Sequence, residues 1–248
     1  HPDAVVLQVF PYNDLCNNSL GLADTCSRLD EHRPYFVLDG DGRLRLTWLH
    51  PFRARARRTL RLFGLAENLE LWRGLVVEGE TEAEFGRRSE DWATANARAR
   101  GLELSGNLYA LMPEAGQPEP VRAGWHVTEA LLAAFDDELS ARGIRLAVVV
   151  IPFVRTVTEG WEYFRRYHRA PLEAGYDTGR VESFLAGRGV PTLSMRERLL
   201  AGETPPAQSF NRRNLHLSQL GHRQVAEWIE RLLVEEGWLP AGAPIPAV

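Results

Sequence analysis

The sequence predicts an α/β fold, a parallel β-sheet with helices on both faces. Three observations favour it. Residues 4–10 form a short run of apolar and β-branched side chains, which is typical of a buried strand. A helical pattern from Trp125 is closed by Gly143 and runs directly into a second apolar strand, residues 144–151. The alternation of helix and buried strand is the signature of this fold class.

Further elements follow from local patterns. Residues 35–38 and 43–48 flank Asp39-Gly40-Asp41-Gly42, which predicts a β-hairpin. Helices are expected around residues 163–167 and 181–186, and a short strand at 190–193. Ser218 is a candidate cap for a last helix whose inner face carries the apolar side chains Val225, Ile229, Leu232 and Leu233.

The middle of the chain is less regular. Residues 52–75 show an arginine-rich helical pattern, which we interpret as a solvated face and not as a membrane-binding surface. Residues 76–122 are polar and punctuated by glycine and proline. We therefore expect one domain over residues 1–239, with an insertion or cap at about 33–122 and a flexible tail at 240–248.

Composition excludes several kinds of chemistry. The chain contains no lysine, which excludes a phosphate-loop lysine and a Schiff-base lysine. The formal net charge of -4 argues against a nucleic-acid surface, and no apolar run is long enough to predict a transmembrane segment. No CxxC pair or HExxH helix occurs, so no metal site is predicted.

Cys16 and Cys26 lie close together in a polar segment. A local disulfide would fit an exported or periplasmic protein, whereas two reduced thiols would fit a cytoplasmic one. We predict the disulfide, because free cysteines usually pack within apolar runs.

Two polar segments could carry chemistry. Asn13 directly follows the first strand, and an asparagine amide there could donate a hydrogen bond to an oxyanion. Turn formation is the simpler explanation for that residue type. His216 precedes the last helix and could act as a general base, although a surface or capping histidine would look the same.

Together the two segments resemble the SGNH (GDSL-type) hydrolase family. Residues 2–14 are similar to its third block, a strand followed by G-x-N-D, with Pro11 in place of the glycine. Residues 214–222 are similar to its fifth block, which holds the base histidine. The resemblance implies a flavodoxin-like sheet and ester hydrolysis through an acyl-serine, with His216 as base, Asn13 in the oxyanion hole and no cofactor.

Two departures from the family pattern matter. Arg213 and Asn214 occupy the positions where the family has its acid, so we place Asn214 with His216 as a candidate catalytic residue. No Gly-Asp-Ser nucleophile block occurs in the sequence, and Ser105 is a poor substitute within the insertion. We expect an upstream segment or a second chain to complete the sheet beside the first strand.

The substrate expected from the resemblance is a small-molecule or saccharide ester. Two alternatives remain open. A catalytically degenerate domain could bind carbohydrate or a partner protein, and the same residues could catalyse O-acyl transfer if a hydroxyl replaced water.

Overall fold

A computed structural model describes residues 2–23, 25–26, 34–48, 94–99, 101–211 and 215–240. The expected helix at 52–75 lies outside the described residues, as do nearly all of the expected tail and most of the expected insertion. Contacts divide the chain into two compact units. The first consists of His1–Pro11 and Leu132–Val248, and the second of Tyr12–Leu131. The predicted single domain with its inserted cap stays a prediction.

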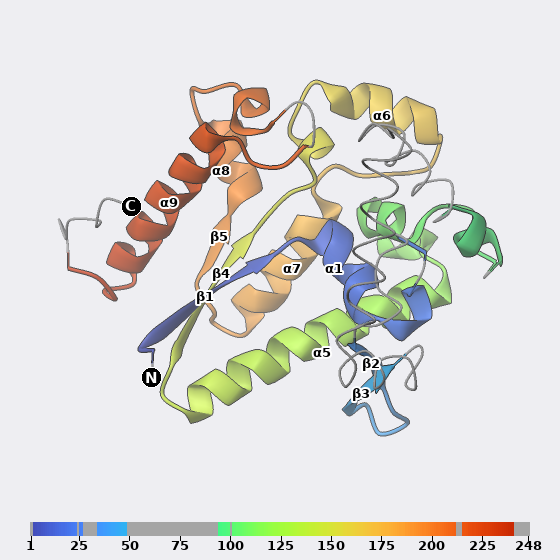
Figure 1. Ribbon diagram of the computed structural model, residues 1–248, viewed down its shortest axis with the longest axis horizontal. Coiled ribbons are helices and arrows are strands. Elements are labelled where there is room, and N and C mark those ends of the chain that lie inside the picture. The colour runs from blue at the N-terminus through green and yellow to red at the C-terminus, as the bar shows by residue number, and fades with distance from the viewer. Residues whose placement is uncertain are drawn as a thin grey trace, which may run out of the picture. The chain divides into compact units, whose positions relative to one another are not determined.

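The first unit confirms the α/β fold (Figure 1). Its parallel sheet has the order β1-β4-β5, formed by β1 (Ala4–Val9), β4 (Arg145–Val150) and β5 (Thr192–Ser194). Ala4 pairs with Arg145 and Val9 with Val150, while Val148 pairs with Thr192. Every residue of β4 after Arg145 is buried, which explains the uninterrupted apolar run in its sequence.

Helices flank this sheet. The connection from β4 to β5 contains α6 (Gly160–His168) and α7 (Tyr176–Gly187), and β5 is followed by α8 (Met195–Ala201) and α9 (Gln219–Glu235). Helices α7 and α9 contact β5, and α7 and α8 contact β4. The expected helices and the expected short strand are thus confirmed. Helix α8 is an additional element that the sequence pattern did not predict.

Strand β1 lies at one edge of the sheet. Among the described residues its sheet partner is β4, and the side chain of Val6 is 36% exposed. An edge strand with apolar side chains invites pairing with another strand.

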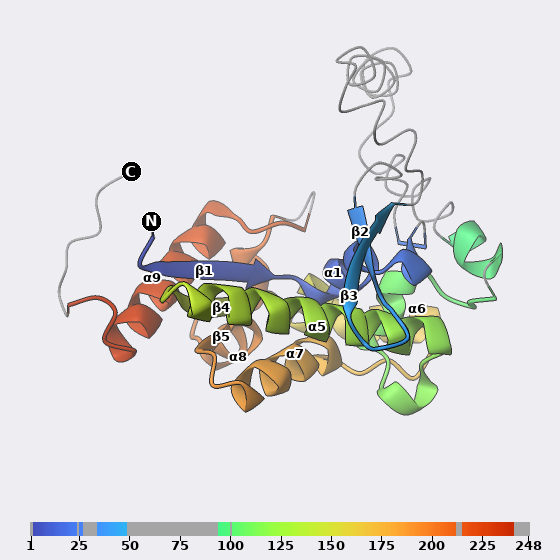
Figure 2. The same cartoon turned by 90° about the horizontal axis from the view of Figure 1, so that it is seen from below.

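The second unit contains the predicted hairpin, which Figure 2 shows from the side. Strands β2 (Pro34–Leu38) and β3 (Leu44–Trp48) pair antiparallel. The carboxylate of Asp39 accepts hydrogen bonds from the backbone N–H of Asp41 and of Arg43, and Gly42 adopts φ 75°. The turn residues therefore act as the sequence predicts.

Turn formation, the simpler sequence-based explanation for Asn13 after β1, is wrong. Residues 11–18 form helix α1 (Pro11–Asn18), followed by the 3₁₀ turn η1 (Leu20–Leu22). Proline is favourable in the first turn of a helix, where its missing N–H costs no hydrogen bond. Leu15 and Cys16 anchor this short helix because both side chains are buried.

The described end of the expected insertion is more ordered than its irregular sequence suggests. Residues 102–112 include the 3₁₀ helix η3 (Gly106–Leu111), and most of their side chains are buried. A second 3₁₀ turn, η4 (Glu114–Gly116), precedes α5 (Glu119–Ala141), which begins before Trp125 and ends at the predicted Gly143 stop. This segment is part of the core of its unit.

Candidate active site

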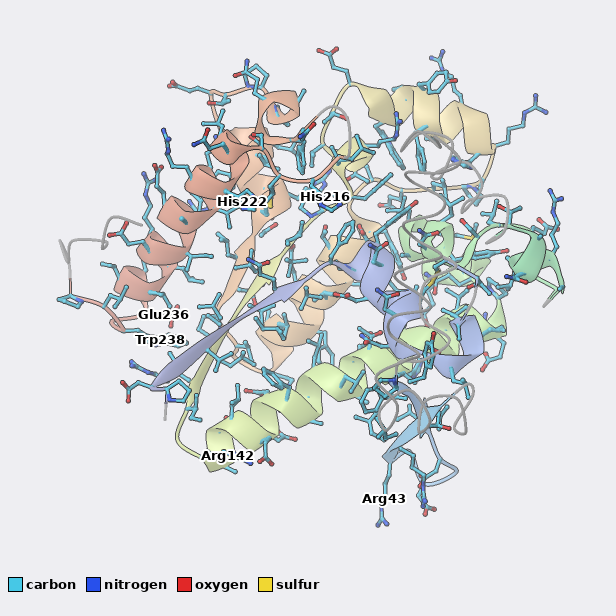
Figure 3. The ribbon with its side chains drawn as sticks, in the orientation of Figure 1. Arg43, Arg142, His216, His222, Glu236 and Trp238 are labelled. Carbon is cyan, nitrogen blue, oxygen red and sulfur yellow. A yellow bond between two sulfur atoms is a disulfide. The ribbon has the colours of Figure 1, made fainter. Side chains whose placement is uncertain are left out.

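His216 lies in the loop between the 3₁₀ turn η6 (Pro206–Ser209) and α9. Helix α9 begins at the end of the sheet toward which the strand arrows point (Figure 1), and Figure 3 labels His216 at that end. Ligands of open α/β folds bind outside the carboxyl ends of the strands. The imidazole is exposed, so a substrate could reach it.

Backbone hydrogen bonds fix the loop around His216. The N–H of Asn211 donates to the carbonyl of His216 at 2.7 Å, and the N–H of Leu215 donates to the carbonyl of Asn211 at 2.8 Å. Phe210 and Leu217 form an isolated antiparallel bridge. Leu215 adopts φ 61°, a conformation uncommon for residues other than glycine, asparagine and aspartate. Backbone hydrogen bonds therefore hold His216 in place while its side chain is exposed.

The start of α9 secures this loop further. The hydroxyl of Ser218 accepts a hydrogen bond from the N–H of Gly221 at 3.1 Å and donates to the carbonyl of Gln208 at 2.8 Å. The N–H of Ser218 donates to the carbonyl of Ser209 at 2.9 Å. Ser209 is buried, and its hydroxyl donates to Gln224 at 2.7 Å. The predicted cap at Ser218 is confirmed, and it ties the loop to the helix.

Gly221 makes this arrangement possible. A Cβ atom at this position would lie 2.1 Å from the carbonyl oxygen of Ser209, closer than any real contact. Only glycine lets the first turn of α9 approach the η6 backbone so closely. His222 belongs to the same first turn and is exposed, and Figure 3 shows it apart from His216.

Asn13 lies in the first turn of α1, shortly after the carboxyl end of β1. Its side chain is exposed, and its amide makes no hydrogen bond to the described residues. The amide is thus available to a ligand. Asn13 and His216 belong to different compact units, so their convergence on one cleft stays a prediction. Asn214 and Arg213 lie outside the described residues.

Cys16 and Cys26 are joined by a disulfide, with their Cα atoms 6.2 Å apart. This separation falls within the range that a bridge requires. The bridge packs against Gly106, where a Cβ atom would lie 2.7 Å from either sulfur. The N–H of Gly106 also donates to the carbonyl of Thr25 at 2.9 Å. The disulfide therefore joins α1, which carries Asn13, to residues 25–26, and these contact η3 at Gly106.

Ser105 is not placed to act as a nucleophile. Its side chain is buried, with 6% of the residue exposed, and its hydroxyl donates to the side chain of Asn107 at 3.0 Å. The described residues also contain no group of three histidine, cysteine or acidic side chains that could hold a metal ion. No described helix is long and apolar enough to cross a membrane.

A buried acidic group at the start of α7 was not predicted. Asp177 is fully buried, and neither of its carboxylate oxygens has a hydrogen-bond partner of good geometry among the described residues. Burial raises the pKa of Asp177 to about 7, although nearby backbone amides and Arg196 lower it in part. Burial also raises the pKa of Glu182, which the hydroxyl of Ser194 lowers in part.

The sequence gives no signal for this group, because an acid in the first turn of a helix is common whether buried or exposed. Ser194 ends β5 and Arg196 follows it in α8, so the group lies around the carboxyl end of that strand. The Nε of Arg196 is also buried without a partner among the described residues.

Comparison with known proteins identifies one family. A family model described as "ALGX: SGNH hydrolase-like domain, acetyltransferase AlgX" matches residues 112–244. The match covers more than half of the chain and includes the His216 loop. A search of the curated proteins found no match.

Proposed function

Because the chain belongs to the SGNH hydrolase-like family of acetyltransferase AlgX, we propose that it acts on carboxylic esters by moving an acyl group between oxygen atoms. His216 is the general base, and Asn13 donates its amide hydrogen bond to the oxyanion. When water accepts the acyl group the reaction is ester hydrolysis, and when a hydroxyl accepts it the reaction is O-acyl transfer.

One observation supports this proposal most directly. The loop of His216 is held by backbone hydrogen bonds at the carboxyl end of the sheet, while the imidazole itself is exposed. A general base needs this combination, because a fixed backbone sets its direction and exposure lets it meet the reacting hydroxyl.

The proposed reaction requires a nucleophile. A serine hydroxyl attacks the ester carbonyl while His216 takes its proton, and the alkoxide leaves with a proton from the same imidazole. The acceptor then attacks the acyl-serine, with His216 again as base. No Gly-Asp-Ser block occurs in residues 1–248, so we propose that a segment outside this stretch supplies the serine.

The second candidate function is a degenerate domain that binds carbohydrate or a partner protein without catalysis. The residues at the acid positions favour it, because Arg213 and Asn214 offer no carboxylate to orient His216. In catalytic triads the carboxylate stabilises the imidazolium that forms in the transition state.

A comparison of two proteins tests the proposal. Residues 1–248 and a natural form that carries a Gly-Asp-Ser block are treated with a fluorophosphonate and assayed on 4-nitrophenyl acetate, with and without a sugar acceptor. We expect labelling and turnover only in the longer form. His216→Ala should abolish turnover, whereas His222→Ala, at an exposed histidine nearby, should leave it within about twofold.

Other outcomes would contradict the proposal. Inactivity of the longer form would favour the degenerate binding domain. Labelling of residues 1–248 that is lost in Ser105→Ala would place the nucleophile inside this stretch.

We also propose an exported or periplasmic location, which the Cys16–Cys26 bridge favours because disulfides persist in oxidising compartments.

A further inference from the structure

A pocket of about 510 Å³ lies within the Tyr12–Leu131 unit, between η1, strand β2 and the first turns of α5. Pockets that hold small molecules in proteins have volumes of this order. No residue of the proposed active site lines it. Its lining includes residues 36–38 of β2 and Glu119, Arg122, His126 and Val127 of α5.

One wall of this pocket is apolar. Phe36, Val37 and Leu38 are consecutive residues of β2 and are all half-buried, and Val127 of α5 is buried. The strand is anchored at this point, because Phe36 forms an isolated bridge with Ser19. An apolar group of a ligand would therefore meet a preformed surface and displace water from it.

Helix α5 contributes polar and charged residues to the same pocket. Arg122 and His126 are four residues apart and thus share one face of the helix. Two hydrogen bonds hold the guanidinium of Arg122: Nη1 donates to the carbonyl of Gln117, and Nη2 donates to Glu119 at 3.1 Å. His126 is exposed and has no hydrogen bond to the described residues, so its ring N–H is available to a ligand.

The pair Arg122–Glu119 would not prevent anion binding. The side chain of Glu119 is 75% exposed, and exposed ion pairs of this kind contribute little. A planar guanidinium has five N–H donors, so a carboxylate can bind it while one bond to Glu119 is shared or lost. The fixed carbonyl of Gln117 keeps the guanidinium oriented in either case.

From this arrangement we infer that the pocket binds a small amphipathic carboxylate, with its apolar part against β2 and its carboxylate at Arg122 and His126. This ligand site is independent of the proposed ester chemistry. A cation would be repelled by Arg122, and a purely apolar ligand would leave the two donors unused.

Octanoate is a suitable probe, and 1-octanol and octylamine serve as neutral and cationic control ligands of the same chain length. Binding to residues 1–248 is followed by amide chemical shifts in NMR. We expect saturable shifts at residues 36–38 and 122–127 with octanoate, and affinities at least fivefold weaker for both control ligands. These measurements need no substitution and therefore do not depend on the folding of a variant.

Two substitutions complete the test. Arg122→Gln should weaken octanoate binding at least fivefold. Arg43→Gln removes the same charge from an exposed position on the hairpin (Figure 3) that does not line the pocket, and should change binding by less than twofold. Equal binding of octanoate and 1-octanol, an undiminished affinity in Arg122→Gln, or the absence of saturable shifts at these residues would each overturn the inference.

Discussion

Helices α9 and α7 begin in opposite ways within the same unit. At the start of α9, the Ser218 hydroxyl caps the helix, and Ser209 and Gln224 pair with each other. At the start of α7, Gly175 with φ 85° occupies the cap position without a side-chain cap. Neither oxygen of the buried Asp177 carboxyl group has a hydrogen-bond partner of good geometry within the part of the chain that the structure describes. The start of α9 holds the His216 loop in place, whereas the start of α7 buries the Asp177 carboxyl group, whose ionisation there is costly.

The difference shows what local sequence can specify. A serine before an amphipathic segment predicts a capped helix, and α9 obeys that rule. The start of α7 depends on contacts from elsewhere: a Cβ atom at Gly175 would lie 2.5 Å from Nε of Arg196.

Asp177→Asn should remove a pH dependence of stability. The folded-state pKa of Asp177 is raised from 3.8 to about 7, so the folded state binds more protons than the unfolded state between these values. Stability therefore falls as the pH rises from about 4 to about 7, by at most about 4 kcal/mol. We expect the variant to lose this part of the slope in urea denaturation between pH 5 and pH 8.5.

Asp41→Asn, at an exposed hairpin position, is the matched control and should keep the wild-type slope. An identical pH dependence in Asp177→Asn and the wild type would mean that Asp177 is solvated or paired in solution. The contrast between the two helix starts would then disappear.

Gly221→Ala should break the start of α9. The new methyl group would meet the carbonyl oxygen of Ser209 at 2.1 Å, so the helix must move away from η6. We expect the free energy of unfolding to fall by about 3 kcal/mol, since overpacking against backbone is poorly relieved. Amide chemical shifts around His216 should change as the loop moves.

The control for this substitution lies in α7. Gly179→Ala adds the same methyl group where nothing lies within 4 Å, and should stabilise the protein by about 0.5–1 kcal/mol. Similar effects of the two substitutions on stability would refute the close packing at Gly221.

Removing the disulfide shows how much stability a covalent link contributes, for comparison with the contacts at the starts of α9 and α7. The double substitution Cys16→Ser and Cys26→Ser opens a loop with a sequence separation of 10, which should cost about 2–3 kcal/mol of stability. Thermal or urea unfolding gives the value, and quantitative thiol labelling without reductant checks the bridge itself. Two labelled thiols in the native wild-type protein would contradict it.

Asn214→Asp tests whether the loop before α9 lacks only its acid. In a form that carries the serine nucleophile, a carboxylate at this position should stabilise the imidazolium of His216 and raise ester turnover at least tenfold, about 1.4 kcal/mol. Steady-state rates on 4-nitrophenyl acetate measure the effect. An unchanged or lower rate would mean that another residue supplies the acid or that the geometry differs.

Regular elements of the fold could be predicted because their signals are local. The apolar run of β4, the Asp39–Gly42 turn and the cap at Ser218 each depend on neighbouring residues, and the structure confirms all three. Helix α1 was missed because Pro11, Asn13 and Asp14 favour a turn as readily as the start of a helix.

Tertiary contacts decide the features that could not be predicted. Residues 102–112 contain only the short 3₁₀ helix η3 and show no helical periodicity, and at Gly106 this segment packs against residues 16, 25 and 26, which are distant in the sequence. Asp177 is buried for the same reason. In the candidate site, the residue types of Asn13 and His216 drew attention, but the hydrogen bonds that fix the His216 loop come from Ser209 and Asn211, which carried no recognisable motif.

The pairing of Ala4 with Arg145 has a consequence for the order of folding. Strand β1 leaves the ribosome roughly ten seconds before its partner β4, because about 140 residues separate them and synthesis adds roughly 5–20 residues per second. The Tyr12–Leu131 unit, by contrast, is complete before β4 emerges. The high contact order of the β1–β4 pair therefore makes the pairing of these two strands a late step in folding, after contacts within the Tyr12–Leu131 unit can form.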